Sequence, residues 1–178
     1  MKYFVGYLIR GAAAQWHIDT AKEISEKFNT WKIHQKIPPH LTIFYLDELE
    51  NIDPVRNFLK EWSATAHVVG NFHLNGFDRF DDKVVFAKVE ADNSIFSIVK
   101  NLRKEIKDIT GITKEEFSHW HPHATLANRL PSEEIEKIWK YTMNLEKPDF
   151  TIPFDNVTIF EYAGDREWKI LESFALHS

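Results

Sequence analysis

A five-residue pattern occurs twice in the chain and contains the side chains that could do chemistry. Pro39-His40-Leu41-Thr42-Ile43 and Pro122-His123-Ala124-Thr125-Leu126 both read Pro-His-x-Thr-aliphatic. Alternate side chains of an extended strand share a face, so the His and the Thr of each copy point the same way. Two such strands brought together would place two imidazoles and two hydroxyls in one cleft, a set suited to metal-free acid–base chemistry on a phosphate.

The chemistry of this set follows from the residue types. Histidine has an unperturbed pKa near ~6.5, so it can hold or give a proton at neutral pH. One neutral imidazole takes a proton from the attacking water, and the other, as imidazolium, protonates the leaving oxygen. The threonine hydroxyls donate hydrogen bonds to the non-bridging oxygens, where charge builds in the transition state. The sequence leaves open which histidine is the base.

The elements that must position these strands are also repeated. Strands are expected at residues 3–9 and 84–90, and each is followed by a helix, at 13–28 and 94–109, and then by a His-x-Thr strand. Capped helices begin at Asp53 and Ser132, and further strands are expected at 72–77, 152–162 and 168–176. The two histidines lie roughly eighty residues apart, as do the two leading strands.

This order predicts a single α+β domain over residues 1–178, made from a duplicated unit with pseudo-two-fold symmetry. The two lobes are expected to cover approximately residues 1–80 and 81–178. Symmetry would then place the two His-x-Thr strands equivalently about the axis.

Composition limits the ligand and the compartment. The net charge is −5, which argues against binding of long duplex nucleic acid and leaves a short or single-nucleotide ligand possible. The chain has no cysteine, so disulfides, thiolate nucleophiles and Cys-based zinc sites are excluded. The apolar run at residues 3–9 is too short for a signal peptide or a bilayer span, so we expect a cytoplasmic protein with no membrane segment.

The paired motifs, extended in the second copy to Ala127, resemble those of the 2H (two-histidine) phosphoesterase superfamily. Its members include bacterial 2'-5' RNA ligase-like proteins and cyclic nucleotide phosphodiesterases. The segments 77–80 and 167–176 are loosely similar to the family's pattern, so the resemblance covers most of the chain. It implies a bilobal fold in which antiparallel sheets line a central cleft and helices lie outside, with no metal or other cofactor.

The resemblance also implies an activity. It implies hydrolysis of 2',3'-cyclic phosphates, or of 2',5'-linked phosphodiesters, in nucleotides or at RNA ends, hence a hydrolase of RNA processing. By this match His40 and His123 are the acid–base pair, and Thr42 and Thr125 bind the phosphate. Family cyclic phosphodiesterases typically break the bond to the 3' oxygen. No protein partner is predicted, and neither Lys-x-Asp-Gly nor a phosphate-binding Gly-x-x-x-x-Gly-Lys loop supports ATP-driven ligation.

Four further residues are candidate substrate contacts. Arg129, just after the second motif, could neutralise phosphate charge. Tyr7 and Trp120 could stack on a base, with core packing as the alternative for both. Phe44 shares a face with His40 if the strand is regular, and it would then form part of the cleft wall.

The sequence leaves three alternative functions open. His119, His121 and His123 alternate along the chain and could ligate zinc, although Pro122 interrupts them and no His-Glu-x-x-His pair exists. The protein could instead be a non-catalytic nucleotide- or RNA-binding module. It could also hydrolyse a different cyclic phosphate, such as an ADP-ribose cyclic phosphate or a small metabolite.

Overall fold

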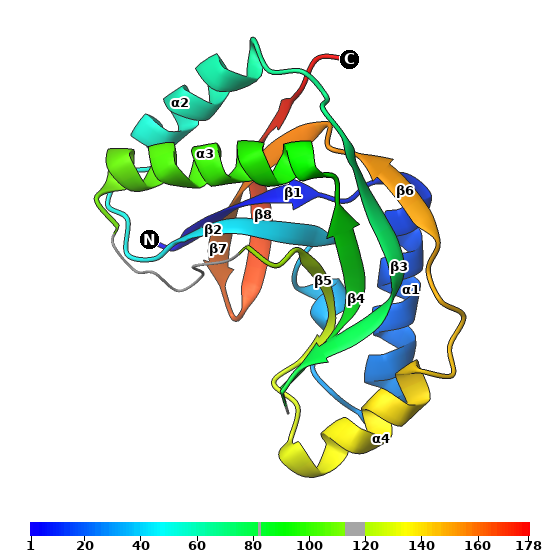
Figure 1. Cartoon of the computed structure of the whole chain (residues 1–178). Coiled ribbons are helices and arrows are strands. Elements are labelled where there is room, and N and C mark those ends of the chain that lie inside the picture. The colour runs from blue at the N-terminus through cyan, green and yellow to red at the C-terminus, as the bar shows by residue number, and fades with distance from the viewer. Residues whose placement is uncertain (82, 113–119) are drawn as a thin grey trace.

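The computed structural model describes residues 1–81, 83–112 and 120–178 and has an α+β fold, as predicted. The described residues form two four-stranded antiparallel sheets with strand orders β2-β1-β7-β8 and β5-β4-β3-β6, together with four α-helices (Figure 1). The strands are β1 (Tyr3–Leu8), β2 (His40–Leu46), β3 (Asn71–Phe80), β4 (Val84–Ala91), β5 (His123–Asn128), β6 (Phe150–Pro153), β7 (Asn156–Gly164) and β8 (Glu167–Ala175). The helices are α1 (Gly11–Phe28), α2 (Asp53–Ser63), α3 (Asn93–Thr110) and α4 (Ser132–Thr142), with a short 3-10 turn η1 (Ile33–Gln35).

Each sheet takes strands from both halves of the chain. In the first sheet β1 and β2 pair with β7 and β8, and in the second β4 and β5 pair with β3 and β6. The lobes are therefore not the contiguous segments 1–80 and 81–178 that the repeat predicts, because β3 belongs to the second sheet. A stable sheet needs three or more strands with a buried face, and pairing between the two halves of the chain places each His-x-Thr strand in a four-stranded sheet.

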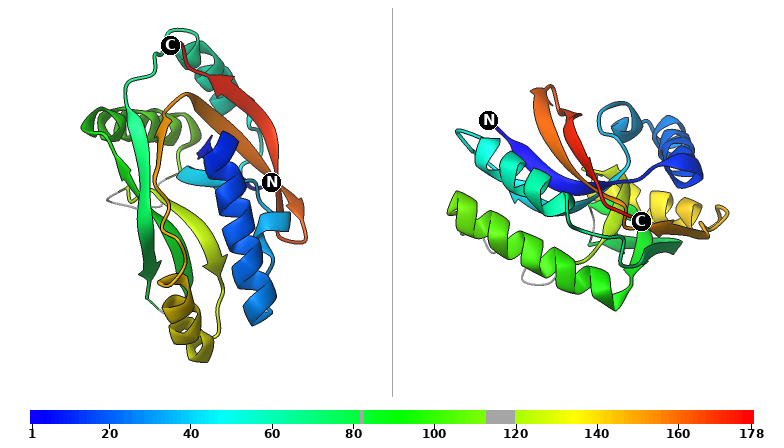
Figure 2. Two further views of the ribbon diagram at one scale, coloured as in Figure 1. Left: turned by 90° about the vertical axis from the view of Figure 1, so that its right-hand side faces the viewer. Right: turned by 90° about the horizontal axis from the view of Figure 1, so that it is seen from above.

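The helices also pack across the two halves of the chain. Helix α1 packs against β5 and α4, whereas α3 packs against β2 and α2, and α2 packs against β7 and β8 (Figure 2). Each long helix therefore covers a sheet that contains the His-x-Thr strand of the other unit. Among the described residues, no helix is both long and apolar enough to cross a membrane.

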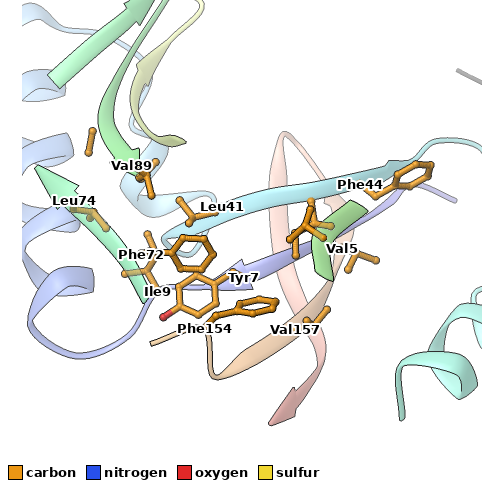
Figure 3. Packing of buried hydrophobic residues seen from close by; sticks show 14 of the residues in the cluster. Val5, Tyr7, Ile9, Leu41, Phe44, Phe72, Leu74, Val89, Phe154 and Val157 are labelled. Atoms are coloured by element: carbon orange, nitrogen blue, oxygen red, sulfur yellow. The ribbon is translucent and has the colours of Figure 1, made fainter. Parts of the chain in front are cut away.

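One apolar core joins the two sheets. Tyr7 of β1 and Phe72 of β3 have ring centroids 4.8 Å apart, and Phe154 packs against both (Figure 3). Leu41, next to His40, is fully buried in the same cluster. Burial of these side chains fixes the two sheets relative to each other and thereby places β2 and β5.

The single strand expected at 152–162 is wrong. The chain leaves the second sheet after Pro153 and enters the first at Asn156, so that β6 and β7 belong to different sheets. Pro153 has no N–H to donate to a ladder, which favours the end of a strand there. Phe154, between the two strands, is fully buried, and its N–H donates to the carbonyl of Gly70.

Strands β2 and β5 each carry a bulge at the same place in the repeat. Gly6 opposes Thr42 and Val5 opposes Phe44, which leaves Ile43 as the extra residue of β2. In β5 the pairing changes in the same way between Thr125 and Ala127. Each bulge reverses the alternation of side chains after the threonine.

Gly6 permits the close approach of β1 to β2 at this bulge. A Cβ there would lie 2.8 Å from the carbonyl oxygen of Leu41 and 3.2 Å from the Phe4 ring. We expect Gly6→Ala to displace β2 and to lower the free energy of unfolding by about 1–3 kcal/mol, measured by urea denaturation.

Gly111→Ala is the control for Gly6→Ala. Gly111 has a φ of +66°, and the Cβ that alanine would add has nothing within 4 Å, so this substitution should cost about 1–2 kcal/mol through backbone conformation alone. The amide resonances of β2 should shift in Gly6→Ala but not in Gly111→Ala. Unshifted β2 resonances in Gly6→Ala would contradict the steric argument.

Candidate active site

Strands β2 and β5 bring the two motifs together. Each lies at one edge of its sheet, and the two strands contact each other (Figure 1). His40, Thr42, His123 and Thr125 are all partly exposed, whereas the residues between them, Leu41 and Ala124, are fully buried. The predicted alternation therefore holds over the first three residues of both strands.

Each imidazole is oriented by a backbone carbonyl two residues earlier in the chain. Nδ1 of His40 lies 2.8 Å from the Pro38 oxygen, and Nδ1 of His123 lies 2.8 Å from the His121 oxygen. A carbonyl only accepts, so Nδ1 carries the hydrogen and Nε2 carries the lone pair in the neutral form. The proline before each histidine has a restricted φ, which helps to hold that carbonyl in place. In both copies this leaves Nε2 as the nitrogen available to a substrate.

Both imidazoles pack against phenylalanine rings. The His40 ring centroid lies 4.7 Å from that of Phe4 and 5.4 Å from that of Phe160. The His123 ring lies 4.8 Å from Phe80 and 5.1 Å from Phe86. Apolar rings on one side of each histidine exclude water and disfavour its charged form.

The surroundings lower the pKa of both histidines. Burial lowers the pKa of His40 to about 4, and the nearby charge of His123 acts in the same direction, while the hydrogen bond to Pro38 opposes them. Burial also lowers the pKa of His123, with the His121 carbonyl opposing it. Burial thus favours the neutral form of His40 at neutral pH.

The threonines are tied through their backbone carbonyls. The Thr42 oxygen accepts a hydrogen bond from Nε1 of Trp120 at 2.8 Å, and the Thr125 oxygen accepts one from Nε2 of His17 at 2.8 Å. Each donor comes from the half of the chain that does not contain its acceptor. The hydroxyls of Thr42 and Thr125 bond to no described residue, so they are available to donate to a phosphate.

Three of the other predicted substrate contacts pack inside the protein or against the motif strand. Tyr7 is 2% exposed, and its hydroxyl donates to the Pro153 carbonyl, so base stacking by Tyr7 is wrong because the ring is in the core (Figure 3). Phe44 as a cleft wall is also wrong, because the bulge turns it into the core. Trp120 packs edge-on against Phe72 and Phe96 and braces Thr42.

A cavity of about 380 Å³ opens beside His40. Arg129 lines it, as does Tyr45, which takes the position on the His40 face that Phe44 would have in a regular strand. The remaining lining residues are Lys2, Phe4, Trp31, Ile37, Asp47, Asn128, Tyr162, Arg166 and Trp168. Sequence analysis missed Tyr45, although two consecutive apolar residues, Ile43 and Phe44, interrupt the alternation and mark the bulge.

No metal centre is evident in the part of the chain that the structure describes. Those residues contain no group of three or more His, Cys, Asp or Glu side chains placed to hold an ion. Of the three histidines in the zinc alternative, His119 lies outside the described residues. The rings of His121 and His123 are 6.3 Å apart, and Nδ1 of His123 is engaged by the backbone.

Comparisons with known proteins agree on one fold. A family model described as the 2'-5' RNA ligase superfamily matches residues 11–166. TT0787 of Thermus thermophilus is similar over 100% of this chain and 99% of its own length, with a TM-score of 0.72 and 16% identity. Escherichia coli LigT is similar over 99% of this chain and 98% of its own, with TM-scores of 0.60 in its NADP+ complex and 0.62 in its 3'-AMP complex, at 15% and 14% identity. Comparison with curated protein sequences gives no match.

The buried His17 should make the free energy of unfolding depend on pH in the acidic range. It is 4% exposed, and burial lowers its pKa to about 4. Its Nδ1 has no partner among the described residues, so a second proton would gain no hydrogen bond. The unfolded chain binds this proton near pH ~6.5, so the stability is full above that pH and falls as the pH drops from ~6.5 to ~4.

We therefore expect His17 to account for a loss of about 2 kcal/mol in the free energy of unfolding between pH 7 and pH 5. Urea denaturation of wild type and His17→Gln at both pH values measures it. The glutamine lowers stability at pH 7 through lost packing, but its own decrease on acidification should be smaller by that amount. Equal decreases in the two proteins would contradict a neutral buried His17.

Proposed function

The chain belongs to the 2'-5' RNA ligase superfamily, and we propose that it is a metal-independent phosphodiesterase of nucleotides or RNA ends. The substrates would be 2',3'-cyclic phosphates or 2',5'-linked phosphodiesters, in agreement with the activity that the motifs imply. The observation that carries the proposal is the matched pair of imidazoles on facing edge strands. Both have Nδ1 bound to a backbone carbonyl, which leaves Nε2 for the substrate.

In the proposed reaction His40 is the base and His123 is the acid. Water attacks the phosphorus and gives a proton to Nε2 of the neutral His40. The bond from phosphorus to one ribose oxygen breaks, and that oxygen takes the proton from Nε2 of His123. The product is a phosphomonoester with a free ribose hydroxyl, and proton exchange with solvent returns the pair to its starting state. Burial, which lowers the pKa of His40 to about 4 and favours its neutral form, supports His40 as the base.

The hydroxyls and one arginine would stabilise the phosphate. Thr42 and Thr125 would donate to the non-bridging oxygens as negative charge develops there. Arg129 lines the cavity next to His40 and would neutralise part of the phosphate charge. A monoanionic diester needs few positive charges, which fits a centre built from neutral donors.

Relatives in complex with nucleotides support the substrate class. LigT structures with NADP+, ATP and 3'-AMP share this fold over almost the full length of both chains. We therefore place the substrate of this chain among nucleotides and short RNA ends with a cyclic phosphate or a 2',5' linkage.

The proposal predicts that turnover depends on both histidines and on no metal. Wild-type protein should hydrolyse adenosine 2',3'-cyclic phosphate or a 2',5'-linked adenylate in EDTA. His40→Ala and His123→Ala should each lower kcat/KM by about 10²–10⁴-fold, because each loses one proton transfer. The control is His67→Ala, which changes an exposed histidine outside the motifs and should leave turnover unchanged.

Other outcomes would point elsewhere. Turnover lost in EDTA and restored by zinc would support the metal hydrolase. Binding of the nucleotide without turnover would support a non-catalytic module. Near-normal turnover in either alanine variant of the motifs would overturn the two-histidine mechanism.

A substrate with an activated leaving group tests the separate roles of the histidines. p-Nitrophenolate leaves without needing a proton, so loss of the acid should matter less for a p-nitrophenyl ester of thymidine 3'-phosphate. We expect the His123→Ala defect on this ester to be at least about tenfold smaller than on the cyclic phosphate, and the His40→Ala defect to be similar on both. The opposite pattern would show that His123 is the base.

A further inference from the structure

The cavity beside His40 extends to one side of the proposed reaction centre. His40 lines it, whereas His123, Thr42 and Thr125 do not. Its other residues come from the end of the first sheet where β1 begins and β2 ends, from the β7–β8 hairpin, and from the connection between α1 and β2. The last residue of β5 and the residue after it also line the cavity. Its volume of about 380 Å³ lies within the usual ~300–1,000 Å³ of small-molecule sites. A group bound there would be an extension of the substrate beyond the reacting phosphate.

Aromatic rings that line this cavity contact one another. The Phe4 ring, which contacts His40, lies 4.9 Å from the ring of Trp168, and Trp168 lies 5.3 Å from Tyr162. Tyr45 lies 5.9 Å from Phe4 on the other side. Tyr45 and Tyr162 are each 38% exposed, so their rings can be reached by a ligand. Flat rings of this kind stack on nucleobases with little regard to sequence.

Three cations line the same cavity. Lys2, Arg129 and Arg166 form no ion pair with any described residue, although the chain as a whole has a net charge of −5. Some cations elsewhere are paired, for example Arg56 with Glu172 at 2.6 Å and Arg79 with Glu136 at 2.7 Å. Among the lining residues, Asp47 is the single carboxylate. The cavity is therefore suited to a ligand that carries more negative charge than a single phosphodiester.

Arg129 is held at the cavity by its backbone and by one ring contact. It has a φ of +57°, a conformation that a residue with a side chain seldom adopts and that costs roughly 1–2 kcal/mol. Its guanidinium carbon lies 5.7 Å from the ring centre of Trp31, which also lines the cavity. The guanidinium is therefore held at the cavity by a ring rather than by a carboxylate, which leaves its charge available to a ligand.

We propose that this cavity is a second subsite that stacks a nucleobase and binds a second phosphate group. The inference rests on the proposed function, since it assumes that the reacting phosphate lies between His40 and His123. It narrows the substrate class to molecules with at least two phosphates, such as an oligonucleotide with a cyclic phosphate at its end. The second phosphate is the 5'-phosphate of the terminal nucleoside, whether it is free or linked to a preceding nucleotide.

Equilibrium binding tests the subsite independently of turnover. Calorimetry would compare adenosine 3'-monophosphate, adenosine 3',5'-bisphosphate and the dinucleotide ApAp. We expect the bisphosphate to bind about tenfold more tightly than the monophosphate, and ApAp about tenfold more tightly again, because stacking adds to the phosphate contact. The first gain should shrink in high salt. A gain for the bisphosphate with none for ApAp would show that the subsite takes a phosphate alone and would overturn the base-stacking part.

Variants assign each gain to a side chain. Arg166→Ala and Lys2→Ala should each reduce the preference for the bisphosphate over the monophosphate, whereas Tyr45→Ala should reduce the preference for ApAp over the bisphosphate. Lys147→Ala is the matched control, because this exposed lysine lies in the α4–β6 connection of the other lobe. It should leave both preferences unchanged.

The two proposals fail in different ways. Equal affinities for all three ligands would overturn the second subsite, even if the cyclic phosphate is hydrolysed. A ranked set of affinities without hydrolysis would overturn the phosphodiesterase and keep the subsite. Preferences that survive in Arg166→Ala, Lys2→Ala and Tyr45→Ala together would place the second phosphate outside this cavity.

Discussion

Two hydrogen bonds between the units hold the motif strands in place. The Thr42 carbonyl accepts from Trp120 and the Thr125 carbonyl from His17, so each strand edge is fixed by a ring from the other half of the chain. Both strands lie at the edges of their sheets, where only one neighbour is available. Each bond contributes only about 1 kcal/mol net, but it fixes the strand two residues after the histidine. The facing geometry of the imidazoles depends on this exchange.

The centre of the site contains neutral donors and acceptors with apolar support. Phenylalanine rings behind His40 and His123 lower both pKa values, and no described carboxylate contacts either imidazole to oppose this. The negative charge that would favour an imidazolium must then come from the phosphate. A bound anion favours the imidazolium and raises its pKa, so the acid would be charged when substrate is present. In the proposed mechanism this arrangement would couple protonation of the acid to substrate binding.

The two strand bulges mark the place where the symmetry of the candidate site ends. After each threonine the strands change register in the same way, so Tyr45 in β2 and Asn128 in β5 occupy equivalent positions. Both line the cavity, yet one offers an aromatic face and the other an amide. The two-fold relation thus holds for the histidines and threonines and ends at Tyr45 and Asn128, three residues after each threonine. A nucleotide, which has no two-fold symmetry, needs such a difference in its surroundings.

The sequence by itself determined the motif, the fold class and the order of most elements. These depend on local periodicity and on a repeat, which a single chain displays directly, and β1, β4, α1 and α3 lie close to their expected ranges. Only the tertiary structure showed that β3 joins the sheet of β4 and β5 and that β7 joins the sheet of β1 and β2, because strand pairing is non-local. It also decided that Phe44 and Tyr7 are in the core, since one extra residue in a strand reverses every later side chain, and burial depends on what covers a face. The cavity cations come from three distant segments that no spacing rule connects, so only the folded chain shows Lys2, Arg129 and Arg166 around one space.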